Sequence, residues 1–346
     1  MLLTLLLVAG LRVSSHLLHP QTIIVTGATG KVGRLVVQNL LSRQQSTSHQ
    51  FQVLALARNA TKFHSQFSLN DNLQFVHGDI ADPTTLPRVL GRIQPQSEVS
   101  VIMVHGTFRP TRFSDLNPFT LFGKKGAVDV SSHIHDKAHP YYVNYLPIIQ
   151  LIELSKTVKF KKVVRLTGLS TGFLPFNPVS IIFNLLLSFS SKYHSLAEKA
   201  LMESDLDCVA LRPGGLSDEE RNVNEANLDV SENSAEIPPP ARCSRRDVAD
   251  LAVEACFFSP TPTPTPTPSS NENRILTLHV RNDPQRGATN AKTFFSAFQP
   301  NFPAQKYYRP IIYNSVGFAV ATALGAAFGF FLWKILLSRF YLRFLI

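Results

Sequence analysis

The sequence predicts an α/β fold in which helices cover both faces of a doubly wound, mainly parallel sheet. One observation is the alternation of short apolar runs with longer helix-like runs between residues 21 and 258, which parallel strands joined by crossover helices require. A second is that the first apolar run, residues 22–25, passes through a glycine-rich turn directly into a helix-like segment. We therefore expect one large domain over residues 21–300.

The turn after the first strand reads Thr-Gly-Ala-Thr-Gly-Lys-Val-Gly over residues 26–33. In a strand–turn–helix setting, Gly27 permits the tight turn, Gly30 lets the backbone approach a pyrophosphate, and Gly33 lets the helix pack against the strand. The helix N-terminus adds free N–H groups and a positive dipole end. A turn that needs glycine for its shape alone is the competing explanation, but this context favours a dinucleotide site.

Later elements follow from composition. Residues 261–268 alternate threonine and proline, which forbids both helix and ladder hydrogen bonds, so we place a surface linker at residues 259–269 and a last strand at 274–280. The apolar run at residues 179–189 is too short to span a bilayer. We expect it to be the first half of a helix that continues to Met202.

The turn at residues 26–33 resembles the TGATGxVG motif of the short-chain dehydrogenase/reductase superfamily, specifically its atypical, NmrA-like branch. The resemblance covers about residues 21–258 and implies a Rossmann-type domain that binds NAD(P)(H). Further segments are similar to that family in the same order: the second strand at 51–58, a GDxxD turn at 78–82, the fourth strand and cofactor loop at 99–107, the fifth strand at 163–168, an RPGG turn at 211–215 and an SRxDVA helix start at 244–249.

An acidic residue at the end of the second strand would bind the ribose 2′-OH of NAD, whereas this chain has Arg58 there, with Lys62 and Arg34 nearby. A guanidinium suits a 2′-phosphate, so the sequence favours NADP(H) over NAD(H). The cofactor-binding residues that the resemblance implies are Gly27, Thr29, Gly30, Lys31, Val32, Gly33, Arg58, Asp79, Ile80, His105 and Gly106.

Superfamily members that reduce carbonyls use a Tyr-x-x-x-Lys pair, in which the lysine lowers the pKa of the tyrosine, and a serine after the fifth strand. Here the tyrosine position falls on Ser190 and the lysine position on His194, so the pair is absent. The serine position falls on Thr167 or Gly168, with Ser170 one step beyond. The candidate catalytic residues that remain are Tyr193, His194 and Ser170.

Three functions remain open. The first is a membrane-anchored, NADPH-dependent reductase or epimerase-like enzyme acting on an apolar small molecule, with Tyr193 or His194 as proton donor. The second is a non-catalytic dinucleotide-binding protein that senses redox state or scaffolds a membrane complex. The third, a structural membrane protein without cofactor, is disfavoured by the intact glycine turn. Substrate contacts are expected from the loops beyond the carboxyl ends of the strands, at residues 108–142, 169–192 and 217–242.

No metal site is predicted. His133, His135 and His139 have i, i+2, i+6 spacing, which does not place three ligands on one helical face, and with Asp129 and Asp136 they match no zinc pattern. We expect a polar surface loop there. The three cysteines, Cys208, Cys243 and Cys256, are widely spaced, which favours a reducing compartment over a disulfide framework.

The formal net charge of +10 suggests an anionic partner. The basic residues are scattered and no nucleic-acid module is apparent, so nucleic acid is not expected as a partner.

Residues 311–333 form a run of 23 residues without a charge, between Arg309 and Lys334. At about 1.5 Å per residue such a run can cross a bilayer. Gly325 and Gly329 offer a small-residue face for helix–helix contact. The sequence therefore predicts a single-pass, C-terminal transmembrane helix, followed by a basic, apolar tail at residues 334–346, with the domain in the cytosol.

Residues 1–20 form an apolar N-terminal segment that could be a signal sequence or a membrane segment. Its start lacks the basic n-region of a secretory signal. Asn59 begins a glycosylation acceptor just after the second strand, where a glycan would crowd the adenosine end of a dinucleotide. We favour a membrane-associated N-terminus over secretion.

Overall fold

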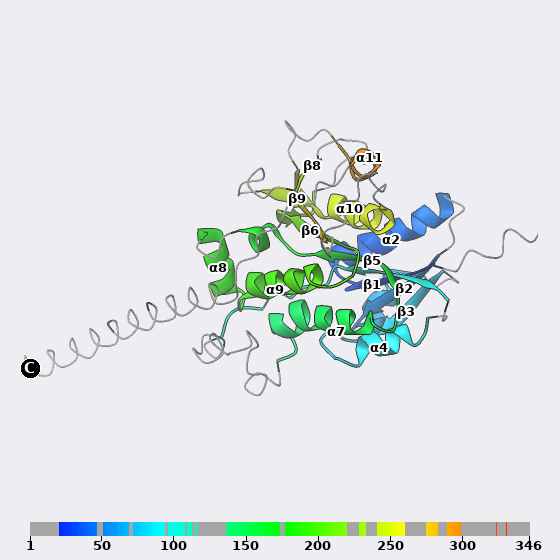
Figure 1. The fold of residues 1–346 in the computed structure, drawn as a ribbon, viewed down its shortest axis with the longest axis horizontal. Helices are drawn as coiled ribbons and strands as arrows, with labels where there is room; N and C mark the ends of the chain where they lie inside the picture. The colour runs from blue at the N-terminus through cyan, green and yellow to red at the C-terminus, as the bar shows by residue number, and fades with distance from the viewer. Residues whose placement is uncertain are drawn as a thin grey trace, which may run out of the picture.

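The computed structural model describes one mainly parallel sheet between two layers of helices (Figure 1). This confirms the predicted α/β, Rossmann-type architecture. The described part of the chain comprises residues 21–46, 51–68, 72–93, 96–107, 109–112, 115, 136–173, 177–219, 228–232, 241–259, 275–282, 289–298, 323 and 330.

Within the described residues the main sheet has eight strands in the order β3-β2-β1-β4-β5-β6-β10-β8. All neighbouring pairs are parallel except β8 and β10. The strands are β1 (Gln21–Thr26), β2 (Phe51–Ala57), β3 (Leu73–His77), β4 (Glu98–Met103), β5 (Phe160–Leu166), β6 (Cys208–Pro213), β8 (Leu228–Ser231) and β10 (Ile275–Asn282), with a small pair formed by β7 (Gly215–Ser217) and β9 (Arg242–Ser244). The last strand predicted at residues 274–280 is confirmed as β10.

Both faces of the sheet are buried, which explains the continuous apolar runs of the strands. In β1, Ile23 and Val25 belong to one core cluster and Ile24 to the other, because successive side chains point to opposite faces. The first cluster packs under α2 (Lys31–Ser46), α10 (Arg245–Phe257) and α11 (Ala291–Ala297), and the second under α4 (Thr85–Leu90), α7 (Leu146–Leu154) and α9 (Ser190–Met202).

The strand order reverses at β1, which pairs with β2 on one side and β4 on the other. The loops that leave β1 and β4 therefore diverge and open a crevice at the carboxyl ends of these strands, the usual ligand position in open α/β sheets. A short helix, α3 (Ala60–His64), follows β2 at the same edge.

A single helix from residue 179 to Met202 is a wrong prediction. The segment forms two helices, α8 (Pro178–Leu186) and α9, because Ser188 (φ 51°) and Phe189 (φ 61°) adopt left-handed backbone, which a continuous helix excludes. The turn is held by hydrogen bonds to a distant loop, since the backbone N–H of Ser188 donates to Thr111 Oγ1 at 2.7 Å. The apolar composition of the run carried no information about those partners.

No helix among the described residues is long and apolar enough to cross a membrane. Several predicted segments lie outside the described residues: the N-terminal segment at 1–20, most of the linker at 259–269, the transmembrane helix at 311–333 apart from Ala323 and Phe330, and the tail at 334–346.

Candidate functional site

A cavity of about 470 Å³ lies at the carboxyl ends of β1, β2 and β4. The glycine turn forms one wall, and the ends of the neighbouring strands form the others. The lining residues are Gly27, Thr29, Gly30, Leu56, Ala57, Arg58, Lys62, Gly78, Asp79, Ile80, Val104, His105, Gly106, Thr107, Ala138 and Val143. Eight of the eleven residues that the sequence assigned to a cofactor are in this set.

The three turn glycines have different roles. Gly27 has φ +73°, and a Cβ there would lie 2.9 Å from His105 Cα. A Cβ on Gly33 would lie 2.1 Å from the carbonyl oxygen of Gly27, so this glycine is required for helix α2 to pack against the turn. At Gly30 the nearest atom, also Gly27 O, would be 3.1 Å away. A Cβ at Gly30 would therefore make a tight contact with the turn backbone, though a much less severe one than at Gly33, and its absence leaves space for a ligand.

Cations gather at one side of the cavity. Arg58 lies 3.9 Å from the Asp79 carboxylate but keeps 73% of its side chain exposed, and Lys62 lines the same wall. A second hollow of about 400 Å³ shares Thr29, Gly30 and Lys62 with the first and adds Arg34 and Arg246. The three cations that the sequence assigned to a 2′-phosphate thus lie around adjoining hollows.

Three of the predicted cofactor residues lie outside the first cavity. Lys31 forms an exposed ion pair with Asp218 at 2.6 Å and lines only the second hollow. Val32 is buried in the core, and Gly33 is buried between α2 and the turn. Only the backbone N–H groups of Val32 and Gly33, at the start of α2, remain available to an anion.

His105 connects the cavity to a buried polar cluster. Its Nδ1 lies 2.6 Å from Thr26 Oγ1, and its Nε2 lies 3.0 Å from both the Val143 carbonyl oxygen and Arg165 Nη1. Burial, together with the Arg165 charge, holds the pKa of His105 well below its usual range. His105 is therefore a neutral imidazole at the wall of the cavity.

Arg165, in β5, is fully buried, and the sequence analysis did not single it out. Its Nη2 donates to the carbonyl oxygen of Asn144 at 3.0 Å and lies 3.5 Å from His194 Nδ1. Among the described residues, it forms no ion pair with a carboxylate, and its Nε has no hydrogen-bond partner. Burial lowers the pKa of Arg165 to about 10, still cationic at neutral pH. A charged residue inside an apolar strand was the available signal.

Asn144 belongs to a π-helical turn, η2 (Tyr141–Tyr145), that leads into α7. Its side-chain Nδ2 donates to Ser190 Oγ at 3.0 Å, while its Oδ1 is buried without a partner among the described residues. Val143, one residue earlier, lines the cavity. η2 therefore lies where the cavity wall meets the buried guanidinium of Arg165. π-Helical turns are rare and are often found at functional sites.

A second buried network lies beside the first. Glu198 is completely buried and accepts hydrogen bonds from Thr167 Oγ1 at 2.7 Å and from Arg212 Nε at 3.1 Å. Arg212 Nη1 contacts His279 Nε2 at 3.1 Å, and His279 is neutral because burial lowers its pKa to about 3. Thr167, one of the two predicted serine positions, thus donates to a buried carboxylate.

The structure brings only one of the three candidate catalytic residues to Arg165. His194 is half-buried and faces the guanidinium; burial and the Arg165 charge lower its pKa to about 3. Tyr193 instead packs edge-on against Tyr141 and His139 in an aromatic cluster, and burial raises its pKa. Ser170 Oγ pairs with Ser191 Oγ at 2.9 Å.

The prediction of a polar surface loop is wrong at His139, because this side chain is buried and only 2% exposed. Its Nε2 lies 3.8 Å from Asp115, a buried carboxylate that also binds Arg109. Asp136 pairs with Arg109 at 2.7 Å and with Arg112 at 2.9 Å. The remaining members of the rejected metal cluster, Asp129, His133 and His135, lie outside the described residues.

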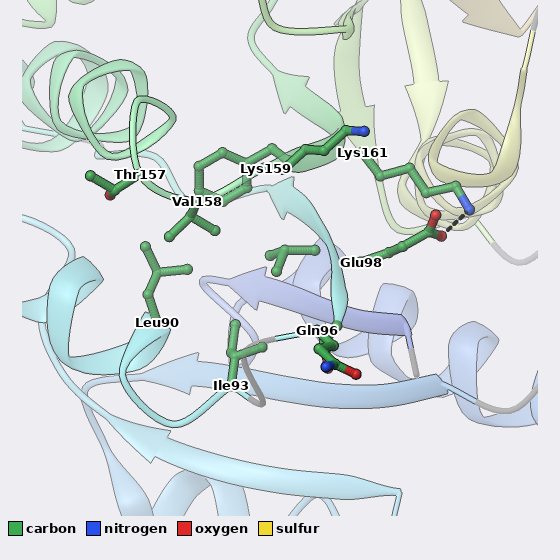
Figure 2. Close-up of a pocket in the computed structure, with 11 residues that line it drawn as sticks. Leu90, Ile93, Gln96, Glu98, Thr157, Val158, Lys159 and Lys161 are labelled. Atoms are coloured by element: carbon green, nitrogen blue, oxygen red, sulfur yellow. Dashed lines mark hydrogen bonds and ion pairs between the residues drawn. The ribbon is translucent and has the colours of Figure 1, made fainter. Parts of the chain in front are cut away.

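A third hollow, of about 730 Å³, lies at the opposite edge of the sheet, where β4 and β5 begin. Figure 2 shows Leu90, Ile93 and Val158 among the side chains that line it, with Lys161 paired to Glu98 at 2.5 Å. It is larger than the cavity at the glycine turn, but it lacks a glycine turn and lies away from the carboxyl ends of the strands. Its size alone therefore does not make it the ligand site.

A family model described as NAD(P)H-binding matches residues 27–257. An uncharacterised chloroplast protein of Arabidopsis thaliana is 26% identical over 282 residues, which is 81% of this chain and 75% of the relative. A second chloroplast protein of the same plant is 27% identical over 240 residues, 67% of this chain and 71% of the relative. A candidate NAD-dependent epimerase/dehydratase from Bacillus halodurans superposes with a TM-score of 0.54 at 17% identity, over 80% of this chain and 100% of that one, and shows the fold alone.

Proposed function

Since the chain belongs to the NAD(P)H-binding family, we propose that it is a membrane-attached NADPH-dependent reductase or epimerase-like enzyme that acts on an apolar small molecule. The observation that carries the proposal is the cavity at the glycine turn, where Gly30 leaves room for a pyrophosphate beside the N-terminus of α2. When bound, a nicotinamide dinucleotide supplies hydride transfer.

The cations at the cavity edge support a preference for NADP(H). Arg58 and Lys62 line the wall where β2 ends, and Arg34 lines the adjoining hollow. A guanidinium can bind a 2′-phosphate with two parallel hydrogen bonds, an interaction that the uncharged ribose of NAD offers much less. Arg58 is also exposed enough to swing towards a ligand.

His194 is the hydrogen-bond donor that we propose for the substrate. A neutral imidazole polarises a carbonyl by donating an N–H bond, without first being protonated. Its Nδ1 faces Arg165, and a guanidinium only donates, so the proton of His194 belongs on Nε2. Arg165 acts as a positioning residue: its charge disfavours the imidazolium and favours negative charge that develops nearby.

A non-catalytic dinucleotide-binding protein is the second candidate. It is favoured by the positions of Tyr193 and His194, neither of which lines the cavity. The Tyr193 phenol lies in an aromatic cluster, where burial raises its pKa. Reduction assays with NADPH and aldehyde, ketone and quinone substrates separate the two functions, because the second predicts dinucleotide binding without turnover.

Calorimetric titration with NADPH and NADH tests the proposal. The wild type should prefer NADPH, and Gly30→Val should weaken binding at least a hundredfold, because the added side chain occupies ligand space. Its unfolding temperature should fall less than that of Gly33→Val, since a Cβ would lie 3.1 Å from Gly27 O at Gly30 but 2.1 Å at Gly33. Arg58→Glu should flatten or reverse the NADPH preference. Undiminished NADPH affinity in Gly30→Val would refute the site.

The cellular setting is proposed from sequence. The uncharged run at residues 311–333 supports attachment to a bilayer, and the names of the two plant relatives place them in chloroplasts. We propose an organellar membrane, with the domain on its cytosolic face. Imaging of a fluorescent fusion, followed by protease protection of the domain, checks both statements.

A further inference from the structure

Helix α8 has its polarity reversed. A surface helix normally buries its apolar stripe and exposes polar residues, but α8 buries Ser180 (0% exposed) and Asn184 (6%). The large apolar side chains that it exposes are Ile182 (53%), Phe183 (42%) and Leu186 (62%). The outer face of α8 is therefore a patch of three large apolar side chains, defined by these residues.

The buried polar residues explain why the helix does not rotate to hide this patch. Asn184 Oδ1 accepts a hydrogen bond from the backbone N–H of Lys192 at 3.1 Å, and Ser180 Oγ donates to the carbonyl oxygen of Ser170 at 3.2 Å. Rotation of α8 would break both hydrogen bonds and leave the Ser170 carbonyl oxygen and the Lys192 N–H without these partners. The outward direction of the apolar residues is fixed by the packing of α8.

The C-terminal end of α8 is fixed as well. The backbone N–H of Thr111 donates to the carbonyl oxygen of Leu186 at 3.0 Å. Ser188, with its left-handed backbone, donates through its N–H to Thr111 Oγ1, and its hydroxyl contacts the buried Arg109. Strained backbone of this kind persists only where neighbouring contacts stabilise it, and it is often found at functional sites. Hydrogen bonds to residues 109–111 therefore hold the helix that carries the patch in place.

We propose that α8 lies in the surface of a lipid bilayer, with Ile182, Phe183 and Leu186 inserted among the acyl chains. The proposal rests on the membrane attachment given under the proposed function. Interfacial helices have this arrangement of one apolar face towards lipid. Arg112, which follows Thr111 beside the end of α8, pairs with Asp136 at 2.9 Å and keeps 65% of its side chain exposed.

The uncharged run at residues 311–333 favours lipid over a protein cover for the patch. A helix of those 23 residues would be about 34 Å long, whereas the nine residues of α8 extend about 13 Å. Packed against α8, the run would leave most of its own apolar surface in water. A bilayer accommodates both the run and the patch.

The position of α8 gives the proposal a functional consequence. The helix follows η3 (Leu169–Gly172), which leaves β5 at its carboxyl end, the sheet edge that also carries the cavity. An apolar substrate dissolved in the bilayer would therefore reach the site on the side that faces the membrane.

Environment-sensitive fluorescence of the full-length chain tests the proposal. Cys208, Cys243 and Cys256 are buried, so a fluorophore can be attached at Ile182→Cys and, as the matched control, at Lys159→Cys, an exposed position at the opposite sheet edge. The protein is reconstituted into phosphatidylcholine–phosphatidylserine vesicles, with or without brominated acyl chains, and flotation is measured on the same samples.

We expect the label at residue 182 to shift to the blue and to be quenched at least fivefold more by brominated lipid than the label at residue 159. Adding Phe183→Ser and Leu186→Ser should abolish most of this quenching. The unfolding temperature should fall by only a few degrees, because Leu186 is 62% and Phe183 42% exposed.

Vesicle flotation without quenching at residue 182 overturns the lipid contact and leaves membrane attachment intact. A blue shift without quenching also overturns it, since protein, either residues 311–333 or a second copy, would then cover the patch. Quenching without stable flotation supports the contact and refutes the anchor. Neither quenching nor flotation refutes both.

Discussion

Replacing Glu198 by glutamine should reveal how much stability depends on one buried negative charge. Glu198 accepts hydrogen bonds from Arg212 and Thr167, and its charge also attracts the buried Arg165. Glutamine preserves the shape and one acceptor oxygen but removes the charge. Removing one partner of a buried ion pair typically costs about 3–5 kcal/mol, and the retained acceptor places our expectation near the lower end, at about 3 kcal/mol.

Guanidinium unfolding followed by circular dichroism measures this loss. With about 2–4 °C per kcal/mol for a domain of this size, the unfolding temperature should fall by about 6–12 °C. Glu203→Gln is the matched control, because the Glu203 side chain is 62% exposed at the end of the same helix, and it should change the free energy of unfolding by less than about 0.5 kcal/mol.

A double variant separates charge from packing. Adding Arg212→Met to Glu198→Gln removes the cation that had lost its carboxylate, so the pair should be less destabilised than the sum of the single variants. Strict additivity, or a Glu198→Gln protein within about 1 kcal/mol of wild type, would refute the reasoning.

Three further predictions concern the turn, pH and attachment. Gly33→Ala should destabilise the fold by about 1–3 kcal/mol, because its Cβ would lie 2.1 Å from Gly27 O. Gly30→Ala should destabilise it less, because the same contact would be 3.1 Å; equal stability of the two variants would contradict the assigned roles. Burial raises the pKa of Asp250 to about 6, so the native state binds a proton more tightly than the unfolded state, and the stability of the fold falls as pH rises from about 4 to 6. Asp250→Asn should therefore be more stable than the wild type above pH 6, by about 1–3 kcal/mol. Urea titrations should show this difference disappearing near pH 4. Deleting residues 311–346 should yield a domain that still binds dinucleotide but is released by carbonate extraction, while the full-length chain stays in the pellet; release of the full-length chain would exclude a membrane-spanning segment.

The fold and the cofactor cavity were predictable because their signals are local. The glycine turn lies between a strand and a helix that are contiguous in sequence, and parallel order follows from the alternation of the runs. The cluster around Arg165 is different: its contacts with Asn144, His194 and His105 join residues 21, 29 and 60 positions apart. No rule of sequence spacing relates such positions. Only the folded topology shows that the Arg165 guanidinium contacts the imidazoles of His105 and His194.

The reversed polarity of α8 escaped prediction for a related reason. Periodicity indicates which residues share a helix face, but not which face meets the domain when polar side chains have buried partners elsewhere in the chain. Asn184 is directed inwards by the backbone of Lys192, and that contact depends on the left-handed turn at Ser188 and Phe189. Both are strained positions that residue preferences disfavour.

The π-helical turn η2 sets the rotational phase of the helix that it begins. An α-helix advances about 100° per residue, so one additional residue in the turn rotates everything before it by about that angle relative to α7. Val143 in the cavity wall and the Asn144 carbonyl at Arg165 both depend on this phase. A substitution in η2 changes a side chain but keeps the Asn144 backbone carbonyl, whereas loss of a single residue displaces both contacts. The length of this turn therefore constrains the site more strictly than its composition.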